Sequence, residues 1–226
     1  MSFSSKVKAE LLSHISTGRH CRMAELAAMI AMSGEYRDGV WTMRGGKTRS
    51  YRRKSTKLTA LLDVDINTPE GRQMLKLTDH GDYLSVNPIL VERNCCKQAF
   101  IRGAFLATGS LTDPEKGYHF EIVCDHAEQA DMLARLIRDF SIEPKQIQRK
   151  KYYVVYIKDG SMIVDLLNIM GAHVSLMDME NIRILKDMRN SVNRRVNCET
   201  ANLNKVVSAA RASRWKTSRI LNRQRD

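Results

Sequence analysis

Apolar residues recur at helical spacing in two segments that align with each other at an offset of 75 residues, Cys21 to Gly34 and Cys96 to Gly109. Both segments carry small residues at every fourth position, which places those residues on one helical face. These are Ala24 and Ala28 in the first segment and Ala99, Gly103 and Ala107 in the second. We predict two repeats whose helices pack closely across a pseudo-twofold axis, although two ordinary core helices would give the same pattern. The two glycines are expected in the left-handed conformation that ends many helices.

The pattern after the second of these helices predicts the remaining elements of its repeat. The predicted elements are a strand around 111–117, a strand at 119–124, a helix at 127–140, a hairpin at 146–157 and a helix at 161–170. Helices mixed with antiparallel strands predict the α+β class.

The first repeat has a weaker pattern beyond Tyr36. It indicates a strand at 40–43, a short helix at 70–77 and a strand at 82–86. The stretch 45–57 shows little apolar periodicity and is predicted to be a basic loop.

Charge is concentrated in two stretches of this chain of net charge +12. Residues 44–57 hold seven basic residues and no acid, and residues 183–226 hold twelve basic and three acidic residues. This distribution favours local contacts with a polyanion such as nucleic acid. The candidate contacts are Arg149, Lys150 and Lys151 on the hairpin, Arg52, Arg53 and Lys54 in the first stretch, and Arg189, Asn193, Arg194 and Arg195 in the second. Charged runs also occur on solvated faces without any ligand.

Other site classes find little support in the sequence. The N-terminus does not resemble a signal peptide, and no apolar run approaches the roughly 20 residues that span a bilayer. We therefore expect a cytoplasmic protein that does not enter a membrane. The five cysteines are Cys95–Cys96 and the isolated Cys21, Cys124 and Cys198, without CxxC spacing. They predict buried free thiols, with no metal site and no cofactor.

The two repeat helices resemble the LAGLIDADG motif of homing endonucleases, loosely at 26–34 and well at 101–110. More specifically, the chain resembles the WhiA family of regulators at 95–110, 113–122, 185–194 and 196–205. The resemblance is strong from about 94 to 210, fair over the first 36 residues and poor between. It implies a pseudo-twofold LAGLIDADG homing-endonuclease-like fold of two helix/antiparallel-sheet repeats, at 1–92 and 93–182, followed by a helical linker at 183–226.

The resemblance also implies function. Members of this family are DNA-binding transcriptional regulators of sporulation, cell division or chromosome segregation, and a C-terminal helix-turn-helix follows the linker. In such a scaffold the sheet faces the DNA. We expect a nucleoid-associated monomer that binds double-stranded DNA, with a sigma factor or another regulator as an alternative partner.

Two stretches depart from the family pattern. Residues 45–57 do not resemble it, and the chain stops where the helix-turn-helix should begin. The tail from Arg211 is unlike the family, and codons for its Arg-Trp-Lys-Thr-Ser segment, read in a shifted register, can give the Val-Glu-Asp-Ile that the resemblance implies, so we expect a truncated or frameshifted reading frame.

Active homing endonucleases carry an acid at the end of each motif helix, where the two carboxylates hold a divalent cation. The corresponding residues here are Ser33 and Thr108, whose neutral hydroxyls cannot replace that charge. We therefore predict no catalytic residues. Three hypotheses remain: a DNA-binding regulator, a protein-interaction scaffold, and a residual metal-dependent nuclease. Binding that weakens steeply with salt would favour the first over the second.

Overall fold

The computed structural model describes residues 2–44 and 50–223 of the 226-residue chain. It divides into two units, Met1–Glu180 and Asn181–Asp226. The two predicted repeats lie together in the first unit, and the exact boundary between them stays a prediction. None of the helices in the described ranges has the length and apolar character that crossing a bilayer requires.

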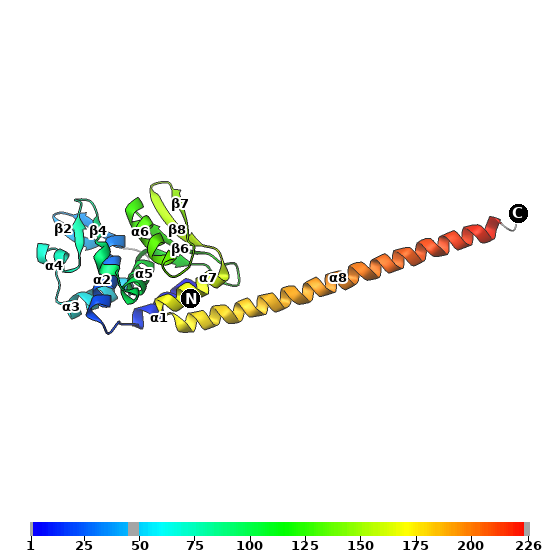
Figure 1. Ribbon diagram of the computed structural model, residues 1–226, viewed down its shortest axis with the longest axis horizontal. Helices are drawn as coiled ribbons and strands as arrows, with labels where there is room; N and C mark the ends of the chain where they lie inside the picture. The colour runs from blue at the N-terminus through cyan, green and yellow to red at the C-terminus, as the bar shows by residue number, and fades with distance from the viewer. Residues whose placement is uncertain (1, 45–49, 224–226) are drawn as a thin grey trace. The chain divides into compact units, whose positions relative to one another are not determined.

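Two 15-residue helices, α2 (Arg19–Ser33) and α5 (Asn94–Thr108), form the largest helix–helix contact in the first unit (Figure 1). The predicted small-residue face lies in this contact. Ala24, Ala28 and Ala99 are fully buried, and Ala107 is half-buried against the core. A Cβ atom added to Gly103 would lie 2.4 Å from the carbonyl oxygen of Glu25 on α2. The prediction of two closely packed repeat helices is therefore confirmed.

The second repeat follows the predicted order of elements. They are β5 (Gly109–Leu111), β6 (Phe120–Cys124), α6 (Ala127–Arg138), β7 (Lys145–Arg149), β8 (Tyr152–Ile157) and α7 (Gly160–Met170). The strands form an antiparallel sheet in the order β5-β6-β8-β7, with Ile122 opposite Val155. Alternate residues of β6 (Phe120, Ile122 and Cys124) are buried, so one face of the sheet belongs to the core.

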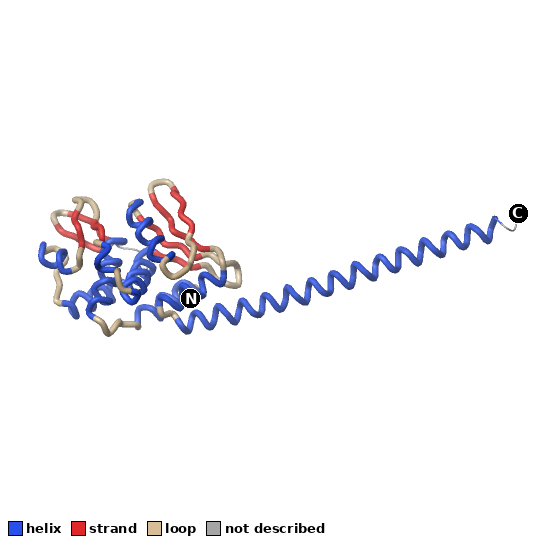
Figure 2. Tube along the Cα trace, viewed as in Figure 1, coloured by secondary structure: helices blue, strands red, loops and turns tan. Residues whose placement is uncertain are grey.

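In the first repeat, too, the motif helix is followed directly by a strand, but the strands do not join into one sheet. Its elements are β1 (Gly34–Arg37), β2 (Val40–Met43), α3 (Ser50–Leu62), α4 (Pro69–Met74), β3 (Leu77–Asp79), β4 (Leu84–Val86) and a 3-10 turn at Pro88–Val91. Its strands form two separate hairpins, drawn red in Figure 2. The Trp41 indole of β2 donates to Asp79 of β3 and so connects the two hairpins, while Asn67, which precedes α4, accepts from the Trp41 backbone N–H at 2.7 Å.

Several local predictions are wrong. Residues 50–57 belong to helix α3 and not to a basic loop, because Tyr51, Lys54, Leu58 and Leu62 form a buried stripe at helical spacing; residues 45–49 lie outside the described ranges. Gly34 and Gly109 are extended, with φ of −66° and −78°, because each helix continues directly into a strand. Helix α1 (Phe3–Ser13) was not predicted. Leu77, predicted to end a helix at 70–77, belongs to strand β3.

Helix α8 (His173–Arg223) crosses the boundary between the units, and its residues up to Glu180 belong to the first. The described part of the second unit is entirely helical, as predicted for a linker. Several of its described apolar side chains, among them Leu185, Met188 and Val192, are more than half exposed.

Candidate nucleic-acid interface

The C-terminal ends of α2 and α5 are the positions at which the resemblance to the LAGLIDADG motif led us to look for acidic residues. Here both end in hydroxyl side chains that turn back into their own helices. Ser33 Oγ donates to the Met29 carbonyl at 2.6 Å, and Thr108 Oγ approaches the Ala104 carbonyl at 3.5 Å. The nearby Glu35 accepts from Arg37 at 2.7 Å. The chemistry of this end is therefore that of neutral hydrogen-bonding groups and ion pairs.

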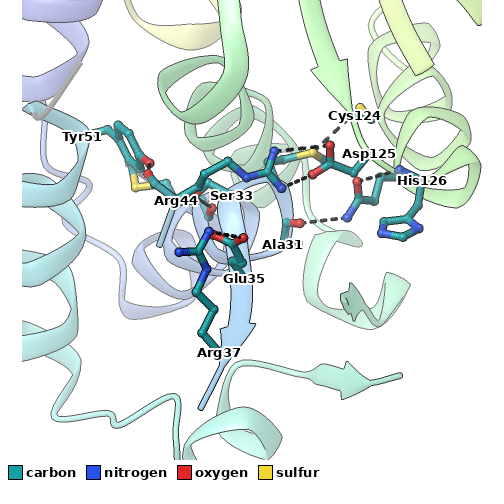
Figure 3. Close-up of polar contacts among 12 residues, drawn as sticks. Ala31, Ser33, Glu35, Arg37, Arg44, Tyr51, Cys124, Asp125 and His126 are labelled. Atoms are coloured by element: carbon teal, nitrogen blue, oxygen red, sulfur yellow. Dashed lines mark hydrogen bonds and ion pairs between the residues drawn. The ribbon is translucent and has the colours of Figure 1, made fainter. Parts of the chain in front are cut away.

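An ion pair joins the two repeats beside these helix ends (Figure 3). Arg44, directly after β2, places its two terminal nitrogens 2.5 and 3.4 Å from the carboxylate oxygens of Asp125, directly after β6. The hydrogen bond with Asp125 raises the pKa of Arg44, so the guanidinium stays charged. The Arg44 backbone N–H donates to the Ser33 carbonyl at 2.7 Å, and the Tyr51 hydroxyl donates to the Arg44 carbonyl. This arrangement fixes Arg44 across the seam between the repeats.

The predicted basic hairpin reaches the same end of the fold. Lys151 and Tyr152 line an open cavity of about 590 Å³ together with Arg44 and Glu35. Arg149 is exposed and lies 3.3 Å from Glu121 of β6. Lys150 is exposed at the tip with a φ of 55°, and the Lys151 ammonium lies 5.2 Å from the centre of the Tyr152 ring. The tip thus presents two exposed lysines, of which Lys151 lies at the same cavity as Arg44.

The second candidate set separates into two kinds of residue. Arg52 and Arg53 are exposed on α3, and Arg52 also donates to the Met43 carbonyl. Lys54 is buried, with 2% of its side chain exposed, and its ammonium lies 2.5 Å from Glu25. Its prediction as a phosphate contact is wrong, because the ammonium also donates to the Leu11 carbonyl inside the core. Burial lowers the pKa of Lys54, and the charge of Glu25 acts against this shift.

The third set, Arg189, Asn193, Arg194 and Arg195, is exposed on α8 in the second unit. A helix turns by about 100° per residue, so Arg189 and Asn193 share one face while Arg194 and Arg195 point elsewhere. Helical geometry therefore makes a single four-residue patch impossible here. Apart from Lys54, the DNA-binding role of the residues in all three sets stays a prediction.

Within the described residues, the group of His, Cys, Asp and Glu side chains that could hold a metal lies at the opposite ends of α2 and α5. It consists of His20, Cys21, Cys95 and Cys96. The interpretation of Cys21 as isolated is wrong, because residues 75 positions apart meet where the repeat helices begin. The prediction of buried thiols holds for Cys21, Cys96 and Cys124 and is wrong for Cys95 and for Cys198 of the second unit, which are exposed on helix surfaces.

Comparisons with known proteins agree with this architecture. Residues 97–189 match a family model described as the WhiA LAGLIDADG-like domain. A "Probable cell division protein WhiA" of Lachnoclostridium phytofermentans is 46% identical over 93% of this chain and 78% of its own length. A protein of the same name from Lachnospira eligens is 40% identical over 93% of this chain and 76% of its own.

Solved structures show the same fold. The full-length DUF199/WhiA protein from Thermatoga maritima aligns with a TM-score of 0.68 at 22% identity, covering 91% of this chain and 74% of that one. The N-terminal LAGLIDADG domain of DUF199/WhiA aligns with a TM-score of 0.60 at 21% identity, covering 75% of this chain and 92% of that domain. The predicted α+β fold of the LAGLIDADG type is confirmed.

The sequence match contains a length difference. The alignment with the Lachnoclostridium phytofermentans protein extends over 243 positions, whereas 93% of this chain is only about 210 residues. Roughly 30 positions of that relative therefore have no counterpart here.

Proposed function

The chain belongs to the WhiA family, and we propose that it is a DNA-binding regulator of cell division or sporulation without nuclease activity. The observation that carries the proposal is the pair of exposed lysines at the hairpin tip, Lys150 and Lys151, of which Lys151 lines a cavity with Arg44 at the end of the fold where the motif helices finish. Nucleoid association follows from the same proposal.

The exposed lysines of the hairpin tip support binding to phosphates, whereas the cavity beside them is lined by Glu35, Asp82 and Asp125 as well as by Arg44 and Lys151. Arg44 and Arg149 are held in ion pairs, so they act as fixed parts of the surface. Lys150 and Lys151 occupy a tight turn whose backbone holds them at the tip of the hairpin. Lysines in this position neutralise backbone phosphates without reading bases, which predicts affinity with little sequence preference.

The absence of nuclease activity is inferred from the helix ends. Ser33 and Thr108 supply no charge for a divalent cation, and Asp125 is already committed to Arg44. Incubation of supercoiled plasmid with the chain and Mg²⁺ or Mn²⁺ is expected to leave the plasmid intact. Nicking that the Glu35→Gln substitution abolishes would contradict this inference and support the residual nuclease.

The test of DNA binding is the salt dependence of affinity for a random-sequence duplex, followed by fluorescence anisotropy. Each phosphate contact contributes about 0.9 to the slope of log K against log salt, so Lys150→Gln with Lys151→Gln should reduce the slope by about 1.8. The matched control is Lys116→Gln with Lys158→Gln, which removes two exposed lysines at the opposite end of the same sheet. This control should leave the slope unchanged.

Two results would overturn the proposal. Equal losses in the hairpin and control variants would indicate general attraction to a basic protein. No binding at low salt would leave the scaffold hypothesis, which the exposed apolar residues of the second unit favour. That alternative predicts salt-insensitive binding to a protein such as a sigma factor.

A further inference from the structure

We propose that His20, Cys21, Cys95 and Cys96 bind one Zn²⁺ ion where α2 and α5 begin. The site lies at the helix ends opposite the candidate nucleic-acid interface, so it is separate from the proposed function.

The distances within the group are those of a nearly formed tetrahedral site. His20 Nδ1 lies 3.1 Å from Cys96 Sγ, 3.2 Å from Cys21 Sγ and 3.9 Å from Cys95 Sγ. All four ligand atoms lie within 4.8 Å of one another. Usual zinc bond lengths put a nitrogen and a sulfur about 3.5 Å apart and two sulfurs about 3.8 Å apart in a tetrahedron. Small side-chain adjustments would therefore suffice to bring all four atoms onto one ion.

The pseudo-twofold arrangement explains why the four residues meet. His20 and Cys21 are the second and third residues of α2, and Cys95 and Cys96 are the second and third residues of α5. Each repeat thus contributes the same two helical positions, 75 residues apart. The packing of α2 on α5 then holds the two pairs together without any CxxC sequence.

In the metal-free chain, burial raises the pKa of Cys21 to about 12 and also raises the pKa of Cys96, so these two thiols are protonated and would become thiolates only as the metal binds. The ends of the two helices act in the opposite direction. Neither α2 nor α5 has a side-chain hydrogen bond at its N-cap, which is Gly18 in α2 and Arg93 in α5. Helix N-termini carry partial positive charge and stabilise thiolates, so both helices support the anionic ligands. Gly18 also leaves room for the imidazole, because a Cβ there would lie 3.0 Å from His20 Nε2.

The ligand set selects the metal. Three thiolates and an imidazole are soft and borderline ligands, which suit Zn²⁺ in a closed structural site and are unsuited to Mg²⁺ or Ca²⁺. Binding would release the thiol protons and join the starts of the two repeats through four coordinate bonds. The role expected of the ion is to stabilise the α2–α5 packing.

The experiment measures zinc in the full chain purified under reducing conditions. Elemental analysis should find about one Zn²⁺ per chain, and a thiol-blocking mercurial should release it to a chromogenic chelator. Cys95→Ser and His20→Ala should each reduce the retained zinc at least tenfold after dialysis against a weak chelator. Cys198→Ser, a cysteine of the second unit, should retain it fully, and His20→Cys should restore a four-thiolate site.

Reconstitution of the metal-free wild-type chain with Co²⁺ keeps the proposal testable if a variant fails to fold. A tetrahedral thiolate site should give intense visible absorption that one equivalent of Zn²⁺ abolishes. Zinc that survives the Cys95→Ser and His20→Ala substitutions would be adventitious and would overturn the proposal. A wild-type chain that takes up neither ion, or whose mass shows a disulfide within the group under these reducing conditions, would also overturn it.

Discussion

Replacement of Lys54 by methionine tests whether this residue stabilises the core or contacts DNA at the surface. Lys54 of α3 and Arg102 of α5 both contact Glu25 of α2, at 2.5 and 3.1 Å, and the carboxylate is completely buried. Arg102 also donates to the Met170 carbonyl and to Ser16. One acid therefore connects three helices in a region without solvent to screen its charge.

The magnitude follows from what remains after the substitution. Removal of one partner from a buried ion pair costs about 3–5 kcal/mol, because the other charge loses its compensation. In Lys54→Met, Arg102 still neutralises Glu25, so we expect the lower value, about 3 kcal/mol. In Glu25→Gln two buried cations lose their counterion, and we expect about 5 kcal/mol. At about 2–4 °C per kcal/mol for a domain of this size, Lys54→Met should lower Tm by about 6–12 °C.

Thermal unfolding by circular dichroism measures this loss, and Arg53→Met is the matched control. Arg53 is adjacent, basic and exposed on the same helix, so its replacement should change stability by less than about 0.5 kcal/mol. DNA affinity measured on the folded proteins should follow the reverse order, with a loss only in Arg53→Met. A Lys54→Met chain that melts with the wild type but binds DNA more weakly would refute the buried assignment.

Two further predictions concern helix packing and pH. Gly103→Ala should lower the urea midpoint by an amount equivalent to about 1–2 kcal/mol, because the new Cβ would lie 2.4 Å from the Glu25 carbonyl oxygen and 3.0 Å from Ala28 Cβ. The control is Gly117→Ala, whose new Cβ meets nothing within 4 Å, and it should leave the urea midpoint unchanged. Burial lowers the pKa of Lys8 from 10.5 to about 8, so between these values the unfolded chain binds a proton that the folded chain lacks, and stability should rise with pH. Lys8→Met should therefore have a larger free energy of unfolding than the wild type at pH 7, and this difference should shrink by at most about 3 kcal/mol towards pH 10. Denaturant titrations that give the same difference at both pH values would contradict this.

The second repeat could be predicted from sequence because its signals are local. Phe120, Ile122 and Cys124 alternate with polar or half-buried residues in β6, and the helix predicted at 161–170 ends at Met170, where Gly171 adopts the left-handed conformation. The resemblance to the WhiA family then supplied the relation between the repeats, which periodicity alone left undecided.

The errors arise from contacts between residues distant in sequence. Helix α3 was missed because its buried stripe includes Lys54, which is compatible with the core only beside Glu25, 29 positions earlier. The cysteine group was missed because its members were judged by spacing within one segment. A signal for it existed, since the 75-residue alignment places Cys21 on Cys96 and His20 on Cys95.

Because the sheet of the first repeat is divided and that of the second is continuous, the two halves of the first unit differ. A duplex laid along both repeats would meet four joined strands on one side and two short hairpins on the other. Under the proposed function, the two halves of a bound duplex would therefore meet unequal surfaces, whatever their sequence. The twofold plan thus survives in the two packed helices, while the strands of the first unit have a polarity of their own.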